Sequence, residues 1–241
     1  MLITNIKGLV QVREQGDQWL AGRQMSDLPV LQAAFLEIEN GLIRNYGPMA
    51  ACPSTASTET IDATGRYVLP GFVDSHTHLV FAASREDEFV AKIKGASYAE
   101  IAAKGGGILN SAKKLQQMSE DELFERTLQR AREIIGYGTV AVEIKSGYGL
   151  TVKDEIKMLR VAKRIGEATP LTVKTTFLGA HAIPNEFTNR QDYIDLVMDE
   201  MIPAVAEQNL ANYIAVSYTH LTLPTINGVW GGGGGGGGGV G

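Results

Sequence analysis

The first 65 residues alternate short apolar runs with polar turns, a pattern that predicts a small β-domain. The runs that predict strands are 2–6, 9–12, 34–39 and 42–45. Asn40-Gly41 separates the last two runs, and this dipeptide favours a type I′ hairpin turn. So few short strands would leave an open sheet edge, and we therefore expect partner strands from elsewhere in the protein.

From residue 67 onward, strand-like and helix-like segments alternate. The predicted strands are 67–74, 139–145, 171–178 and 211–214. The predicted helices cover 97–104 and 192–208, and two more begin at Ser119 and Thr151. Ser119 opens a capping box with Glu122, and Thr151 caps the next helix together with Asp154. Pro203 lies inside the last helix and predicts a kink there.

Repeated strand–helix units predict a parallel sheet with right-handed crossovers. Two architectures fit this pattern: a doubly wound open sheet and a (β/α)8 barrel. No GxGxxG motif follows the first strand of the series, which argues against a dinucleotide-binding sheet. Both architectures place their chemistry at the carboxyl ends of the strands, so candidate residues are sought there.

Two histidines come at the end of the first strand of this series. His76 and His78 flank a single residue, so on a strand both side chains project to the same face. Imidazole nitrogen suits Zn²⁺, Fe²⁺ and similar ions, so the pair is a candidate metal site. A bare HxH pair is also common on surfaces, and two ligands need partners from later strands.

The next strand ends offer three further polar groups. Arg85 follows the HxH strand, Tyr148 follows the second strand between two glycines, and His181 follows the third. Each has a plain structural alternative: a solvated arginine, a packed turn aromatic and a hydrogen-bonded loop histidine. Their convergence on one face of the sheet instead favours a site for a small anionic substrate.

Composition and charge narrow the class of protein. Hydrophobic residues make up 44% and charged residues 20% of the 241 positions, as in soluble globular proteins. The net charge of −5 argues against nucleic acid or an acidic membrane as a partner. A single cysteine, Cys52, excludes an intrachain disulfide. With no signal-peptide pattern and no apolar run approaching the roughly 18–20 residues of a membrane span, we expect a cytoplasmic protein.

Glycine is the unusual count, because eleven of the 28 glycines lie in the last 26 residues. Residues 216–225 look like a translated sequencing adaptor, and the nine-glycine run after Trp230 is what a read without signal would encode. We therefore expect authentic protein to end near Ile214 and residues 216–241 to be non-native. A natural flexible glycine linker is the alternative.

Five segments carry a resemblance to a known family. They are LPGFVDSHTH (69–78), LVFAASRE (79–86), AKGGGIL (103–109), EIKSGYGL (143–150) and FLGAHAIP (177–184). The first resembles the opening strand of the metal-dependent amidohydrolase superfamily. Together the five resemble the imidazolonepropionases, the family that carries out the third step of histidine degradation, and the likeness extends to about residue 214.

The resemblance implies an α/β fold in which a (β/α)8 TIM-type barrel carries a small β-sandwich. In this chain, residues 1–65 would be part of the sandwich, 66–215 the first half of the barrel and 216–241 the non-native tail. The implied reaction is hydrolysis of the ring amide of 4-imidazolone-5-propanoate to N-formimidoyl-L-glutamate, with one Zn²⁺ or Fe²⁺/Fe³⁺ ion. The full-length protein is expected to be a homodimer whose partner is this small-molecule substrate.

The same resemblance assigns roles to the candidate residues. His76 and His78 would ligate the metal ion. The implied substrate-binding residues are Arg85, Tyr98, Tyr148 and His181. Arg85 would pair with the propanoate carboxylate, while His181 would also act in catalysis by stabilising the developing oxyanion.

The chain departs from the family in lacking the later ligands. A third metal histidine, further Glu and His groups and an aspartate from the eighth strand are missing, so we expect the chain as written to be inactive and poorly folded. Two alternatives stay open: another amidohydrolase, such as a hydantoinase-like ring opener or a deaminase, and a non-catalytic metal-binding barrel fragment.

Overall fold

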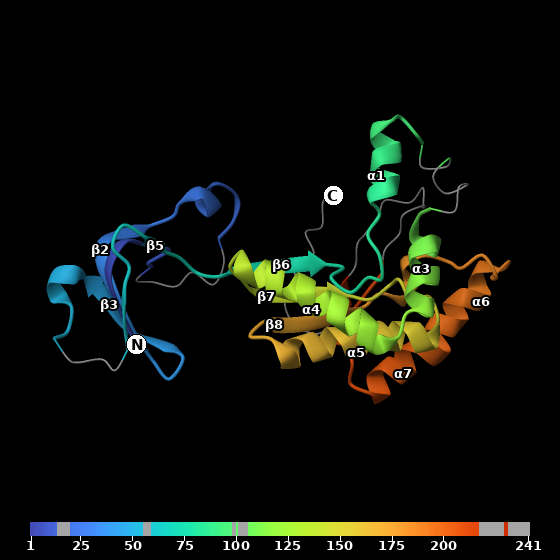
Figure 1. The fold of residues 1–241 in the computed structure, drawn as a ribbon. Coiled ribbons are helices and arrows are strands. Elements are labelled where there is room, and N and C mark those ends of the chain that lie inside the picture. The colour runs from blue at the N-terminus through green and yellow to red at the C-terminus, as the bar shows by residue number, and fades with distance from the viewer. Residues whose placement is uncertain (14–19, 55–58, 98–99, 101–105, 217–228, 231–241) are drawn as a thin grey trace. The chain divides into compact units, whose positions relative to one another are not determined.

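A computed structural model describes residues 1–13, 20–54, 59–97, 100, 106–216 and 229–230. The chain forms two compact units, Met1–Gly71 and Phe72–Gly241 (Figure 1). Each has its own sheet and its own hydrophobic core.

The first unit is a five-stranded sheet. Its strands are β1 (Leu2–Val10), β2 (Val30–Glu39), β3 (Leu42–Pro48), β4 (Thr60–Asp62) and β5 (Tyr67–Val68). The order is β3-β2-β1-β4, and β5 also pairs with β1. Two short 3-10 helices, η1 (Gly22–Ser26) and η2 (Met49–Ala51), lie in the connections. Ile6, Leu9 and Leu36 are buried and belong to its hydrophobic core.

The strand predictions in this unit need one correction. The two expected strands 2–6 and 9–12 are one strand, β1, which ends at Val10 and leaves residues 11–12 outside it. The pairing of β1 with β2 shifts register between Ile3 and Ile6. Asn5 lies in this irregularity with a φ of 55°. The predicted hairpin turn is confirmed, because Asn40 (φ 53°) and Gly41 (φ 77°) both have the positive φ that a type I′ turn requires.

The apolar run 67–74 is not one strand, as the sequence suggested, but parts of two. β5 pairs with β1 in the first sheet, whereas β6 (Phe72–Thr77) pairs with β7 in the second. Pro70 lies in the break, where its missing N–H could not serve a strand ladder. At the start of β6, Phe72 and Val73 are 56% and 70% exposed. β6 is the terminal strand of the described sheet, which leaves these side chains uncovered.

The second unit is built on a parallel sheet. β6 is followed by β7 (Thr139–Lys145), β8 (Thr172–Phe177) and β9 (Tyr213–Ala215), all parallel and in chain order. β10 (Val229–Trp230) pairs antiparallel with β9 at the other edge of the sheet. This curled strand–helix series confirms the predicted α/β fold, a partial (β/α)8 barrel.

Two long helices cover one face of this sheet (Figure 1). α4 (Glu120–Gly136) begins where Ser119 Oγ accepts a hydrogen bond from the Glu122 N–H (3.2 Å). α5 (Val152–Ala168) begins where Thr151 Oγ1 accepts one from the Asp154 N–H (3.1 Å). Both predicted caps are therefore confirmed. The buried side chains between these helices and the sheet include Leu128, Ala131, Val142, Ile144, Leu159, Val161 and Ile165.

The remaining helices differ more from expectation. α1 (Glu86–Ile93) and α3 (Ile108–Gln117) were not predicted, while most of the helix predicted at 97–104 lies outside the described residues. The helix predicted over 192–208 is three segments: α6 (Arg190–Asp195), the π-helical η4 (Leu196–Met201) and α7 (Ile202–Glu207). Pro203 explains the interruption, because it lacks the N–H that would continue the α-helical ladder. Within the described ranges, no helix combines the length and apolarity needed to cross a membrane.

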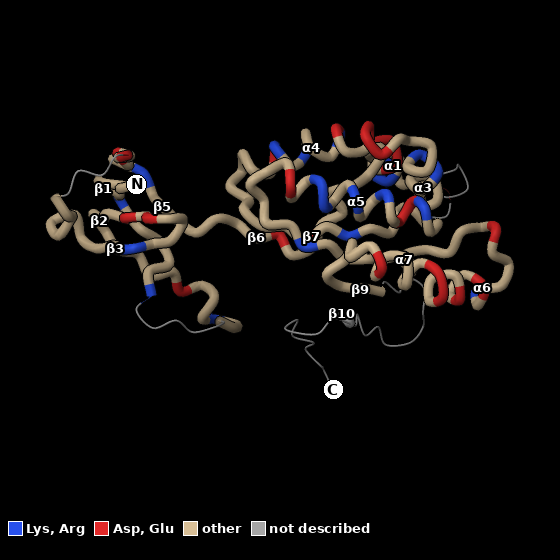
Figure 2. The backbone as a smooth tube through the Cα atoms, turned by 90° about the horizontal axis from the view of Figure 1, so that it is seen from below, with Lys and Arg blue, Asp and Glu red and all other residues tan. Residues whose placement is uncertain are grey.

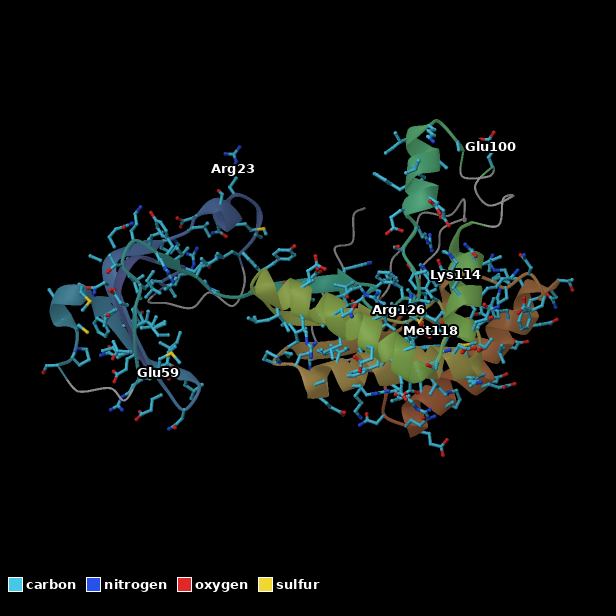
Figure 3. The ribbon with its side chains drawn as sticks, viewed as in Figure 1. Arg23, Glu59, Glu100, Lys114, Met118 and Arg126 are labelled. Carbon is cyan, nitrogen blue, oxygen red and sulfur yellow. The ribbon has the colours of Figure 1, made fainter. Side chains whose placement is uncertain are left out.

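Two arginines of α4 donate hydrogen bonds to backbone carbonyl groups of the segment that follows β6. Acidic and basic residues are interspersed along α4 and α5 (Figure 2). Arg130 donates to the carbonyl oxygens of Leu79 (3.0 Å) and Phe81 (2.8 Å), and its guanidinium lies 3.8 Å from the Phe81 ring centroid. Arg126, labelled in Figure 3, donates to the Ala82 carbonyl (3.0 Å). α4 therefore fixes the segment that leaves β6.

We predict that Arg130→Met loosens residues 79–85 selectively. The substitution leaves two carbonyl groups without their charged donor, and such a bond contributes roughly 1.5–3 kcal/mol. Amide hydrogen exchange in peptides covering 79–85 should become at least about tenfold faster. Arg132→Met is the control, because Arg132 lies on the exposed side of the same helix. Equal effects of both substitutions would contradict the prediction.

Candidate active site

The loops after three neighbouring parallel strands bring four aromatic rings together. His76 lies in β6 and His78 directly follows it, Tyr148 follows β7, and His181 ends the short 3-10 helix η3 (Gly179–His181) after β8. The ring centroid of His78 is 5.9 Å from that of His76, 5.2 Å from that of Tyr148 and 5.3 Å from that of His181. His78 is thus the centre of the cluster, and Tyr148 and His181 are also neighbours at 5.6 Å.

Arg85 lies next to this cluster. Its guanidinium carbon is 5.7 Å from the Tyr148 ring centroid, and its Nε donates to Ser111 Oγ (3.0 Å). Glu88 lies 3.9 Å from Nη1, while the buried Nη2 has no hydrogen-bond partner among the described residues. One side of the guanidinium is therefore held and the other is free for a ligand. Tyr98, the other predicted substrate contact, lies outside the described residues.

Desolvation favours the neutral form of two of these imidazoles, His78 and His181. Desolvation is the main cause that lowers the pKa of His78 to about 4, and the positive charge that His181, His76, Lys145 and Arg85 can carry lowers it further. Desolvation, followed by the charge of Arg85, also lowers the pKa of His181. Burial raises the pKa of the Tyr148 phenol, so it stays protonated at neutral pH.

The neutral imidazoles have unused ring nitrogens. Nδ1 of His78 and Nδ1 of His181 are buried without a hydrogen-bond partner in the described part of the chain. Buried polar atoms are rarely left unpaired, so these atoms indicate a ligand. Neutral imidazole is the form that ligates metal ions, and His76 and His78 fit that role by residue type and placement. Within the described ranges, however, no three His, Cys, Asp or Glu side chains form a metal-binding group.

β7 carries an ion pair that was not predicted from the sequence. Lys145 Nζ lies 2.5 Å from Glu143 Oε1, and each side chain is 12% exposed. Glu143 and Lys145 alternate along β7 with Val142 and Ile144, which pack against the helices, so the charged pair points to the opposite face of the sheet. This alternation of charged and apolar residues is a signal that could have identified the pair from sequence.

Comparison with known proteins places the chain among hydrolases. Residues 59–238 match the model of the Amidohydrolase family. The chain is 54% identical over 217 residues to an imidazolonepropionase of Christiangramia forsetii, covering 90% of this chain and 53% of the relative. It is 53% identical over 216 residues to one of Flavobacterium psychrophilum, covering 89% and 53%. The chain thus spans about half the length of the curated relatives it matches.

Solved structures with the same fold are more distant in sequence. A triazine hydrolase of Arthrobacter aurescens aligns with a TM-score of 0.55 at 16% identity, covering 86% of this chain and 42% of that one. A 5-methylcytosine deaminase of Klebsiella pneumoniae aligns with a TM-score of 0.52 at 16% identity, covering 90% and 50%. An atrazine chlorohydrolase of Arthrobacter aurescens, solved with zinc, aligns with a TM-score of 0.52 at 14% identity, covering 83% and 42%. At these identities the likeness shows the fold.

We predict that His78 in the metal-free protein stays neutral down to about pH 5. Its folded pKa of about 4 lies below the 6.5 of an unfolded histidine, so the unfolded chain binds the proton first. Stability from this group is therefore complete above pH 6.5 and is lost as the pH falls from 6.5 toward 4. NMR titration of labelled histidine, with His78→Asn to assign the signal, measures the pKa. A midpoint near 6.5 would show that the ring is not desolvated as described.

Proposed function

The chain belongs to the amidohydrolase family, and on that premise we propose that its parent protein is an imidazolonepropionase. The reaction is hydrolysis of the ring amide of 4-imidazolone-5-propanoate to N-formimidoyl-L-glutamate. The observation that carries the proposal is the convergence of His78, Tyr148 and His181 beside a guanidinium with one unpaired nitrogen. The identity of about 50% to relatives named imidazolonepropionase supports the substrate.

Arg85 is the residue that binds the propanoate carboxylate. Ser111 holds its Nε, which leaves the buried Nη2 available for a charge-assisted hydrogen bond. Arg85 and His181 are both neighbours of Tyr148, whose ring centroid lies 5.7 Å from the Arg85 guanidinium carbon and 5.6 Å from the His181 ring centroid. A substrate with an anionic arm and a polar ring can therefore reach both residues.

Tyr148 and His181 contact the imidazolone ring. A neutral His181 carries one N–H, which can donate to the carbonyl oxygen as negative charge develops there. The protonated Tyr148 phenol can donate to the ring or to the opened product. Tyr98 is proposed as a further substrate contact.

His76 and His78 would hold one Zn²⁺ or Fe²⁺/Fe³⁺ ion. Imidazole nitrogen suits either metal, and the two residues lie at the end of β6, with His76 inside the strand and His78 directly after it. Such an ion supplies Lewis acidity to the carbonyl and makes its water more acidic. The zinc of the Arthrobacter atrazine chlorohydrolase supports a metal in this fold. The remaining ligands must come from outside the described residues, because those present form no three-ligand group.

We further propose that the chain consists of three parts, which are part of a β-sandwich (1–65), the first half of a barrel (66–215) and a non-native tail (216–241). The tail contains no Asp, Glu, Lys or Arg. The parent protein is proposed to be a cytoplasmic homodimer without a nucleic-acid or membrane partner. The 241-residue chain by itself is proposed to be inactive, since its metal ligands are incomplete among the described residues.

The proposed function is tested by comparing the full-length parent protein with the 241-residue chain. Genomic DNA read past codon 214 gives the coding sequence of the parent protein. We expect that protein to carry about one equivalent of zinc or iron and to convert imidazolone propanoate to N-formimidoyl glutamate, followed by ultraviolet absorbance and mass spectrometry. The 241-residue chain should give no turnover above a metal-only blank. A parent protein with bound metal but no imidazolone hydrolysis would overturn the substrate assignment.

A second prediction concerns Arg85 in the parent protein. Arg85→Met removes the charged partner of the substrate carboxylate and should lower kcat/KM by roughly 10- to 100-fold, mainly through KM. The substrate analogue with a neutral propanamide arm should be a poor substrate of the unaltered enzyme, and Arg85→Met should change its kcat/KM little. Arg132→Met is the surface control. An equal loss for both substrates would mean that Arg85 does not bind the carboxylate.

A further inference from the structure

A buried carboxylate behind the site has no role in the reaction as proposed. Glu155 lies in the first turn of α5 and is fully buried, at 0% exposure. No lysine, arginine or histidine within the described ranges forms an ion pair with it. Burial is the largest influence on its carboxyl group and raises its pKa. A fully buried acid without a cation needs another source of compensation.

That compensation comes from the loop that carries Tyr148. Glu155 Oε2 accepts a hydrogen bond from the Gly147 N–H (2.9 Å), and Oε1 accepts two, from Gly149 (2.8 Å) and Leu150 (2.9 Å). The three donors flank Tyr148 on both sides in the sequence. A ring of backbone N–H groups of this kind binds anions, and here the anion is a side chain of the same chain.

The loop has a backbone that needs such support. Gly147 has a φ of 111° and Leu150 a φ of 58°, a conformation that is unfavourable for leucine. A Cβ on Gly149 would lie 2.3 Å from the Glu155 nitrogen, so the loop lies directly on the start of α5. The three hydrogen bonds to Glu155 therefore hold the loop in a shape that it would not adopt alone.

The other side of the loop contacts the His181 loop. Ser146 donates its N–H to the Thr176 carbonyl (3.0 Å), and its Oγ accepts from the Leu178 N–H (2.9 Å). A Cβ on Gly147 would lie 3.0 Å from the Cβ of His181. A shift of the Tyr148 loop would therefore also displace His181.

We infer that Glu155 is a positioning residue that sets the place of the Tyr148 ring, and through it of His181, by binding the three N–H groups around Tyr148. The inference rests on the proposed function, in which Tyr148 contacts the substrate. Glu155 itself does not touch the substrate, because it lies buried behind the loop.

Glu155→Gln in the parent protein tests this inference. The amide offers one acceptor oxygen and a donor NH₂, so at least one of the three N–H groups loses its acceptor. We expect amide exchange at 147–150 to become roughly tenfold faster, the equivalent of one lost hydrogen bond. KM for the substrate should rise by a similar factor of about ten. Glu167→Gln, at an exposed position of the same helix, is the matched control.

A double-mutant cycle with Tyr148→Phe separates positioning from general stability. If Glu155 acts through Tyr148, Glu155→Gln should raise KM much less when Tyr148 is already Phe. Fully additive effects on KM, or a fall in Tm with unchanged exchange at 147–150, would overturn the inference. Should Glu155→Gln not fold, Glu155→Asp keeps the charge, shortens its reach and is measured in the same way. If the parent protein does not hydrolyse the substrate, the proposed function fails. The exchange measurement still tests whether Glu155 holds the Tyr148 loop.

Discussion

The parallel pairing of β6, β7 and β8 is the constraint on which the candidate site depends. In that pairing Thr77 lies beside Ile144, and Lys145 lies beside Thr176, so the three strands end at nearly the same level. Residues that are far apart in sequence therefore leave the sheet as neighbours. His78, Tyr148 and His181 reach ring separations of 5.2–5.6 Å because their strands are adjacent and point the same way.

The cluster formed in this way is energetically demanding. Two half-buried imidazoles have buried Nδ1 atoms without a hydrogen-bond partner among the described residues, and the Glu155 carboxylate is buried without a cation in that part of the chain. Leu150 also has a positive φ. Each feature is unfavourable by itself, and together they persist only where surrounding structure fixes them. The tightly packed core between α4, α5 and the sheet supplies that rigidity.

Local signals in the sequence predicted the elements that depend on local interactions. Ser119 and Thr151 cap their helices through hydrogen bonds within three residues, and Asn40-Gly41 adopts the turn conformation that its residues favour. The expectation that side chains at the carboxyl ends of parallel strands lie together is also confirmed for His76, His78 and His181. In contrast, the continuous apolar pattern of the run 67–74 favoured one strand, although Pro70 inside it is a strand breaker and the run is divided there between two sheets. α1 was missed although Glu86, Asp87 and Glu88 give its first turn the acidic residues that favour a helix N-terminus.

Glu155 shows why a buried acid that positions a loop is not predicted from the sequence. An acidic residue in the first turn of a helix ordinarily stabilises the helix's own unpaired N–H groups. Glu155 instead turns back to the preceding loop, and that direction becomes possible only because Gly147 and Gly149 let the loop fold onto the helix start. The glycines around Tyr148 therefore do more than permit a close approach to a ligand. They also expose the N–H groups by which a buried acid fixes the loop, so that rigidity and ligand access arise from the same few residues.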